Sequence, residues 1–342
     1  MGMAKRSYSK KGRKIEPAVL TLTINTSLTG GGVASATDYI DLSQIASVAN
    51  RRFYRQGINW AIAGIKILTK ADFNGQVQFS KLPNTWVMSN AWEKSFRTWQ
   101  KMNREALAEA ESVRPKFLDF KVYADSTHHT AGFAANLMPI SYGGIFAPGE
   151  WEASKIYIPD TTTPGTVDTR ELIATGPNFP GAGASGFNAV SLIEGYAASR
   201  GLPYPEDPNA PADADSASGV APQNWMAALF NEGTTQDSAV LDDMIGENNQ
   251  APYPFEGDGT NTDTQYPGGA NQGTGLEVHD ISFVSPTTIG GTSHVKGGNF
   301  PCGLIRIDTL NDAAASEQAV LLLIDMVPGN HRGYLCEPMT DM

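Results

Sequence analysis

The chain has 342 residues, 41% of them hydrophobic, so it can bury the core of one large domain or two ordinary ones. No stretch reaches the roughly 18 consecutive apolar residues of a membrane helix. The basic N-terminus lacks the apolar segment of a secretory signal, and Arg6 stands where a myristoylation motif has Ser or Thr. We therefore expect a soluble protein that is intracellular when made, has no lipid anchor and has no membrane partner.

The net charge of −11 is unevenly distributed along the chain. Residues 1–16 carry six bases and one acid, and residues 51–121 carry 13 bases and six acids. By contrast, residues 122–342 carry six bases and 27 acids. A basic first third beside an acidic remainder predicts a basic tail or face that meets a polyanion.

The first 16 residues contain few apolar side chains, so they cannot offset the entropy of ordering, and we expect a disordered arm. Lysine and arginine neutralise phosphates and release counterions, which gives salt-sensitive binding without sequence preference. The bases expected to contact nucleic acid are Lys5, Arg6, Lys10, Lys11, Arg13 and Lys14. Residues 10–14 also fit a nuclear-localisation signal, and a solubilising tail is a third alternative.

From residue 17 the pattern changes to strands. Residues 18–26 alternate between β-forming apolar and polar side chains, and residues 39–42, 58–67 and 76–80 favour further strands. The second basic cluster, Arg51, Arg52 and Arg55, precedes the third of these strands. These arginines either extend the surface that binds nucleic acid or lie at a subunit interface, where arginine is enriched.

Residues 90–113 break the β pattern. Apolar side chains recur there every three or four residues from Trp92 to Val113, which predicts one long helix. Asn90 with Glu93 three residues later resembles a capping box, and Pro115 marks the end of the helix.

The remainder of the chain predicts further strands among long loops. The strand candidates are residues 116–124, 154–159, 170–175, 277–285, 302–310 and 318–327, and short helices are expected at 188–199, 222–231 and 236–246. Residues 176–276 are rich in turn formers and predict a loop-rich elaboration. Antiparallel strands with long connections predict an all-β chain in which residues 17–342 form a single viral jelly roll, a double-sheet antiparallel β-sandwich with one long inserted helix.

Several segments carry a likeness to a known family. Residues 38–44 (DYIDLSQ), 50–60 (NRRFYRQGINW), 86–96 (WVMSNAWEKSF) and 329–335 (GNHRGYL) resemble the capsid proteins of small circular Rep-encoding single-stranded DNA viruses. The resemblance implies one jelly roll per subunit, an inward basic N-terminal arm and a closed icosahedral shell. The arm here is shorter than those of that family.

Other candidate sites have simpler explanations. Cys302 and Cys336 lack metal-ligand spacing and are expected to be ordinary buried thiols. The turn with Asp258 and Asp263 offers oxygen ligands for Ca²⁺ but departs from the EF-hand spacing, so an Asx-rich turn explains it. His128 and His129 would face opposite ways on a strand, and Asp242 with Asp243, like Glu150 with Glu152, are pairs that any acidic protein offers.

We therefore expect a capsid protein that is not an enzyme and needs no cofactor or metal. It would assemble with itself into a shell of 60 copies or a multiple and package single-stranded DNA, with the virion, and the host nucleus during assembly, as its locations. The alternatives are the coat protein of an RNA virus and, from another class, a secreted β-sandwich carbohydrate-binding module or glycosidase.

Overall fold

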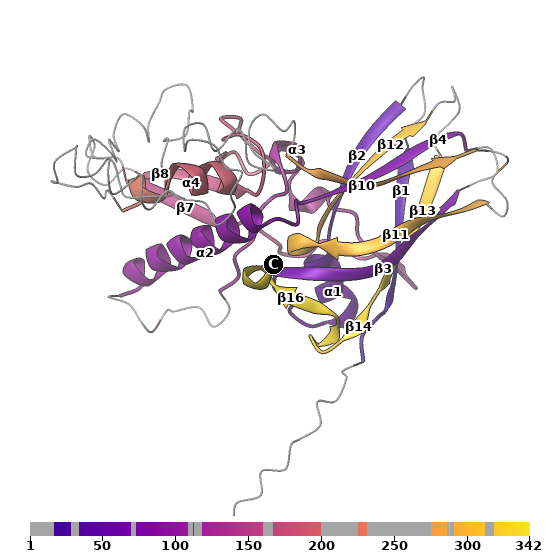
Figure 1. Ribbon diagram of the computed structural model, residues 1–342, viewed down its shortest axis with the longest axis horizontal. Coiled ribbons are helices and arrows are strands. Elements are labelled where there is room, and N and C mark those ends of the chain that lie inside the picture. Colours follow the sequence, from indigo (N-terminus) through magenta and orange to yellow (C-terminus); the bar gives the residue numbers. More distant parts are fainter. Residues whose placement is uncertain are drawn as a thin grey trace, which may run out of the picture.

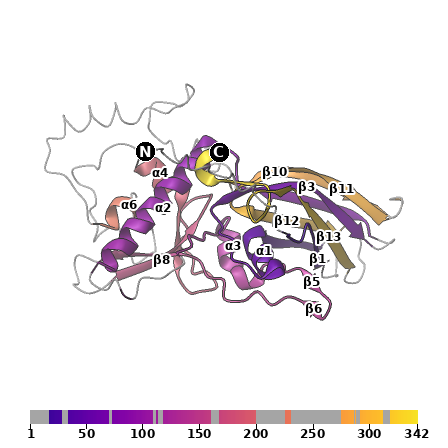
Figure 2. The same ribbon diagram turned by 90° about the horizontal axis from the view of Figure 1, so that it is seen from below.

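The computed structural model describes residues 17–28, 34–69, 73–108, 112, 118–159, 167–199, 225–230, 275–285, 287, 291–311 and 318–342. Strands hold 44% of the described residues and helices 25%, so the chain is mainly β, as predicted. Antiparallel sheets curl into a half-barrel, and a mixed helical and β region lies beside it (Figures 1 and 2).

The first sheet has five strands, and its main path runs in the order β1-β13-β3-β11. These strands are β1 (Thr21–Leu28), β13 (Gln318–Met326), β3 (Ile58–Thr69) and β11 (Thr292–Phe300), and β16 (Cys336–Pro338) pairs with the start of β3. Neighbouring strands are antiparallel, and their register aligns one buried row, in which Ile324 faces both Leu22 and Ile65. Burial alternates with period two along both β1 and β13, so one face of each strand is turned to the core.

The second sheet has four antiparallel strands in the order β10-β4-β12-β2. They are β10 (Glu277–Val284), β4 (Gly75–Lys81), β12 (Leu304–Asn311) and β2 (Ala34–Asp41). Its inward side chains include Ile40, Phe79 and Ile307, which join the buried residues of the first sheet in one hydrophobic core. The two sheets contact each other along both edges: β10 contacts β11 at one edge, and β1 contacts β2 at the other.

A long insertion, residues 82–276, separates the paired strands β4 and β10. Its helices are α2 (Trp86–Ala106), α3 (Ser126–Ala131), α4 (Leu192–Ala198) and α6 (Trp225–Ala228), with the 3-10 turn η2 (Phe133–Ala135). Its strands are the hairpin β5 (Ile140–Ser141) and β6 (Gly144–Ile145) and the sheet of β7 (Lys155–Pro159), β8 (Val167–Ile173) and β9 (Asn188–Ser191). A second hydrophobic core joins α2 to this three-stranded sheet.

Short elements connect the two cores. Helix α1 (Leu42–Asn50) follows β2 directly, and the 3-10 turns η4 (Pro301–Gly303) and η5 (Met339–Asp341) lie before β12 and at the end of the chain. The small sheet of β14 (Pro328–Gly329) and β15 (Gly333–Tyr334) lies below α1 in Figure 1. Met339 of η5 packs in the second core, and Ser89 of α2 donates a hydrogen bond to its carbonyl at 2.7 Å.

The long inserted helix is present, but both of its predicted ends, residues 90 and 113, are wrong, because α2 spans Trp86–Ala106 and Leu107 caps its C-terminus. Helix α2 begins at Trp86, where the Thr85 hydroxyl accepts a hydrogen bond from the N–H of Met88 at 3.4 Å. Asn90 lies inside the helix and is not its cap, so the capping box is wrong. The residues around Pro115 lie outside the described part of the chain.

Most predicted strands in the described residues are present, with three corrections. The end of segment 116–124 is extended but forms no strand, and residues 188–199 are the strand β9 followed by the helix α4. His128 and His129 lie on helix α3, not on a strand. The helix expected at 222–231 is present as α6, and residues 236–246 lie outside the described residues.

No helix within the described ranges has both the length and the apolar character needed to cross a membrane.

One close contact ties the insertion to the first and second sheets, which we together call the sandwich. A Cβ added at Gly57 would lie 2.2 Å from Cζ2 of Trp92, whose ring is packed against Phe96 and Phe120. We expect Gly57→Ala to lower the free energy of unfolding by about 1–3 kcal/mol, because a packed indole cannot move aside freely. Chemical denaturation followed by tryptophan fluorescence measures the change.

Gly143→Ala is the matched control, because an added Cβ at that position meets no heavy atom within 4 Å. It should change stability by no more than about 0.5 kcal/mol. Equal effects of the two substitutions would show that the Gly57 contact does not constrain the fold.

Candidate nucleic-acid interface

Three of the nine bases predicted to contact nucleic acid lie in the described residues, and all three belong to one turn. Arg51, Arg52 and Arg55 follow α1 and precede β3. The bases of the arm, Lys5, Arg6, Lys10, Lys11, Arg13 and Lys14, lie outside the described residues. The described chain begins at Pro17, whose carbonyl accepts a hydrogen bond from the Arg52 guanidinium at 2.9 Å. The arm therefore joins the described chain beside the arginine turn.

Helix α1 begins and ends in ways that place this turn. The carboxylate of Asp41 caps its start by accepting from the N–H groups of Ser43 and Gln44, at 2.8 and 3.3 Å. The helix ends where Arg51 adopts a left-handed conformation, with φ 53°, and its N–H returns to the carbonyls of the last turn. This is the usual geometry of a helix C-terminus, although glycine is the common residue there.

The residues after the helix alternate between the interior and the solvent. Tyr54 and Gln56 are fully buried, whereas Arg55 between them is exposed. The Gln56 amide donates to the carbonyl of Val122 at 3.0 Å and accepts from the N–H of the same residue at 2.7 Å. An extended backbone turns successive side chains to opposite sides, so anchoring Tyr54 and Gln56 presents Arg55 outward.

A fourth arginine joins the turn from the far end of the sequence. The guanidinium of Arg332 donates to the carbonyl of Phe53, and the Tyr54 hydroxyl donates to the carbonyl of Arg332 at 2.9 Å. Arg332 is exposed and lies between β14 and β15. We call Arg51, Arg52, Arg55 and Arg332 the arginine cluster.

Aromatic packing supports the cluster from below. Tyr54 contacts Trp60 and Tyr334, with ring centroids 5.8 and 5.5 Å apart, and all three side chains are fully buried. The hydroxyl of Tyr334 donates to the carbonyl of Val19 at 2.7 Å, and the N–H of Val19 donates to the side chain of Asn50 at 2.9 Å. The first described residues are thus fastened to the end of α1.

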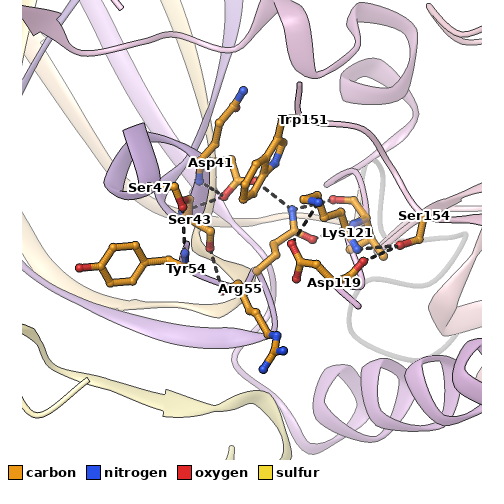
Figure 3. A network of polar contacts seen from close by, with 12 residues as sticks. Asp41, Ser43, Ser47, Tyr54, Arg55, Asp119, Lys121, Trp151 and Ser154 are labelled. Carbon is orange, nitrogen blue, oxygen red and sulfur yellow. Dashed lines mark hydrogen bonds and ion pairs between the residues drawn. The ribbon is translucent and has the colours of Figure 1, made fainter. Parts of the chain in front are cut away.

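The positive charges of the cluster are only partly balanced, since Arg55 interacts electrostatically with the carboxyl of Asp119. Within the described ranges, neither Arg51 nor Arg55 forms an ion pair with an acidic side chain. Burial, and the neighbouring Arg332, lower the pKa of His331. Figure 3 shows the Arg55 guanidinium pointing away from the polar network behind it, while its carbonyl accepts from the Ser43 hydroxyl at 3.2 Å.

That network is centred on buried carboxylates. Besides capping α1, Asp41 accepts hydrogen bonds from the Gln56 amide at 3.1 Å and the Trp151 indole at 2.9 Å. Asp119 pairs with Lys121 at 3.1 Å, and the Lys121 ammonium lies 4.4 Å from the centroid of a Trp151 ring. Burial raises the pKa of Asp119, although the positive charge of Lys121 opposes this effect.

The remaining candidate sites resolve differently. His128 receives a hydrogen bond from the N–H of Ala124 at 3.1 Å and shares one with Asn136 at 2.9 Å, while His129 lies 3.0 Å from the carboxylate of Glu171. The two histidines are therefore engaged within the fold. Glu150 and Glu152 are exposed, and the Asp242–Asp243 and Asp258–Asp263 segments lie outside the described residues.

The described part of the chain contains no group of three or more His, Cys, Asp or Glu side chains able to hold a metal ion. Both cysteines are free thiols, Cys302 fully buried and Cys336 partly buried. Burial raises the pKa of Cys336 to about 12.

Sequence reasoning found three members of the arginine cluster and missed Arg332. The residue lies near the opposite end of the chain from Arg51 and is brought to it by the β14–β15 turn. Residues 329–335 stood out in the sequence only through the family likeness, which gave Arg332 no role. Comparison with known proteins adds nothing to this geometry, since no family model, curated protein or solved structure matches the chain.

The buried carboxyl of Asp41 predicts that the stability of the fold depends on pH. Burial raises the pKa of the Asp41 carboxyl from 3.8 to about 6, outweighing the four hydrogen bonds that favour its ionised form. Because the folded chain holds this proton more tightly than the unfolded chain, protonation of Asp41 stabilises the fold. The stabilisation is complete below pH 3.8 and is lost as the pH rises through 6. A pKa that is higher by about two in the folded state corresponds to roughly 3 kcal/mol of unfolding free energy.

We therefore expect the unfolding free energy of the unmodified chain, relative to that of Asp41→Asn, to fall by about 3 kcal/mol as the pH rises from 3 to 7. Urea denaturation at several pH values measures it. Parallel pH profiles for the two chains would show that Asp41 does not titrate in this range.

Proposed function

We propose that this chain is a viral capsid protein that assembles with itself into a closed icosahedral shell and packages a single-stranded DNA genome. Its fold would be a jelly roll, and its basic N-terminal arm, with the arginine cluster, would hold the nucleic acid. The shell would contain 60 copies or a multiple, the point-group solution for many identical subunits.

The pairing order of the sandwich strands supports the jelly roll. Of the eight main strands counted in chain order, the first pairs with the eighth (β1 with β13) and the second with the seventh (β2 with β12). The third pairs with the sixth (β3 with β11) and the fourth with the fifth (β4 with β10). This nested order is that of one long hairpin rolled into two sheets, the double Greek key used by capsid domains and also by other proteins.

The observation that carries the functional proposal is the position of Pro17. Its hydrogen bond to Arg52 places the start of the described chain, which follows an arm with six bases in 16 residues, at a cluster of four arginines, three of them exposed. Lys14 is three residues from Pro17 in the sequence, so the arm and the cluster would together form one basic region on a chain whose net charge is −11. Such a region suits the irregular phosphate backbone of a single strand.

The choice of DNA rests on the family likeness of residues 38–44 and 50–60, because phosphate contacts do not distinguish DNA from RNA. An RNA-virus coat protein is the alternative within the same class. The virion, and the host nucleus during assembly, are the locations that the proposal implies.

The assembly proposal predicts particles. Negative-stain electron microscopy of the purified protein should show uniform round shells with a raised 260/280 nm absorbance ratio. Removal of residues 1–16 should lower that ratio. Nuclease digestion of the released nucleic acid with DNase or RNase identifies its type.

Shells without nucleic acid would contradict packaging by the arm but not assembly. Small oligomers under all salt and pH conditions would contradict the capsid proposal and favour the secreted carbohydrate-binding module or glycosidase, which glycan arrays would then test.

The arginine cluster predicts a change in salt dependence. Arg51→Ala with Arg55→Ala should weaken binding of a labelled oligo(dT) and reduce the slope of log affinity against log salt by about 0.7 for each phosphate that is no longer neutralised. Fluorescence anisotropy across a range of KCl concentrations measures both quantities.

Arg97→Ala is the matched control, because Arg97 is an exposed arginine that pairs with Glu93 on α2, away from the cluster. It should leave the slope unchanged. An equal reduction of the slope in the two proteins would indicate a general effect of net charge.

A further inference from the structure

The hairpin of β5 and β6 presents an apolar tip to solvent. Tyr142 at its turn is fully exposed, and Ile145 and Ile140 are 61% and 41% exposed. The hairpin is fixed at its base, where Pro139 bridges to Ile24 of β1 and the N–H of Phe146 donates to the Pro139 carbonyl at 3.0 Å. Residues 139–149 contain no charged side chain.

A second apolar surface lies on the outer face of β10. Val278, Ile281 and Phe283 are exposed, with Phe283 at 77%. We call these three side chains the β10 strip. Directly opposed residues of an antiparallel pair share a face, so Gln78 lies beside Ile281, and Gln76 beside Phe283.

The side chains of the strip, like those of the hairpin, are uncharged, and the acidic groups at its border are the exposed Glu277, which precedes Val278, and Asp308 of β12, which lies opposite Gln78. Asp280 lies within β10, but its carboxylate is turned toward β11, where it accepts from the N–H of Lys296 at 3.2 Å. The neighbours on β4, Gln76 and Gln78, are uncharged and can hydrogen-bond to a partner.

The two surfaces lie at opposite edges of the sandwich. The hairpin joins β1, an edge strand of the first sheet, and the strip is on β10, an edge strand of the second. Because β10 contacts β11 and β1 contacts β2, these strands mark opposite edges, as Figure 2 also shows. Within one subunit the hairpin therefore does not cover the strip.

We propose that the hairpin of one subunit docks on the β10 strip of a neighbouring copy of this chain. The contact is head to tail, because a projecting tip meets a flat strip at the other edge, and such contacts close into rings when the rotation allows. Charge points to a second copy as the occupant: identical acidic chains repel each other, and two uncharged apolar surfaces are where they approach with least opposition. The inference rests on the proposed self-assembly and names the surfaces that would perform it.

Cysteine pairs test the contact and its direction. Ile145→Cys protein and Phe283→Cys protein are assembled together and oxidised, and non-reducing electrophoresis should then show a disulfide-linked dimer. Each protein oxidised alone should give little dimer, because a head-to-tail contact brings position 145 to position 283 and not to itself. The native thiols contribute little, since Cys302 is buried and burial raises the pKa of Cys336 to about 12.

Thr130→Cys mixed with Phe283→Cys is the matched control, because Thr130 is exposed on α3, away from the hairpin. This pair should give no dimer above background. Dimers of Ile145→Cys alone, or equal yields from all pairs, would overturn the inference.

Disruption of the apolar surfaces should also reduce assembly. Tyr142→Asp or Phe283→Lys should lower the yield of particles at least about tenfold, and the two together in one chain should restore part of it through a new charge pair between copies. Circular dichroism checks that each variant folds. Particles formed in normal yield by both single variants would overturn the inference while leaving the proposed assembly intact.

Particle formation by the unmodified chain distinguishes failure of the capsid proposal from failure of the proposed hairpin contact. If it stays small under all conditions yet positions 145 and 283 cross-link, the contact stands and the capsid proposal fails. If it forms shells without that cross-link, only the contact is wrong.

Discussion

The carboxylate of Asp41 is buried at the point where three parts of the chain meet. Two of its hydrogen bonds start α1, one holds Gln56 behind the arginine turn, and one comes from Trp151 of the insertion. A buried carboxylate without partners is strongly destabilising, so the three segments must reach it together. The sandwich, the insertion and the arginine cluster are thereby held in one arrangement, and burial keeps the pKa of the carboxyl near 6.

The arginine cluster is built on rigid, buried aromatic packing. Its guanidinium groups come from residues 51–55 and from Arg332, and the buried rings of Tyr54, Trp60 and Tyr334 lie beneath them. Hydrogen bonds cross from each segment to the other, so the backbone of the cluster is ordered before any ligand arrives. Less conformational entropy is then lost on binding than for the same arginines on a free loop.

Local patterns predicted most of the fold, and the failures came from tertiary contacts. The alternation of β1, the apolar run of β13 and the periodicity of α2 are properties of short windows, and they predicted these elements. The end of segment 116–124 has the alternation of a strand, but its pairing with β8 is limited to a bridge between Tyr123 and Ile173. Val122 instead pairs with the Gln56 side chain, and the N–H of Lys121 donates to the Ser154 hydroxyl. No local pattern reports that a side chain will take the place of a neighbouring strand. The same limit hid Arg332, whose role depends on a contact between the two ends of the sequence.

The insertion begins and ends at neighbouring positions of the sandwich, which makes its length easy to change. Lys81 and Glu277, which bound residues 82–276, are directly paired across β4 and β10, so the two ends of the insertion lie about 5 Å apart. Closing a loop between fixed neighbouring ends depends only weakly on its length. Related chains can therefore lengthen, shorten or replace parts of the insertion without altering any pairing of the eight sandwich strands, provided that its buried contacts with the sandwich are kept. These contacts include Trp151 with Asp41, Val122 with Gln56 and Asp125 with Arg306. The site is a natural graft point, where new surface can be added to an unchanged scaffold.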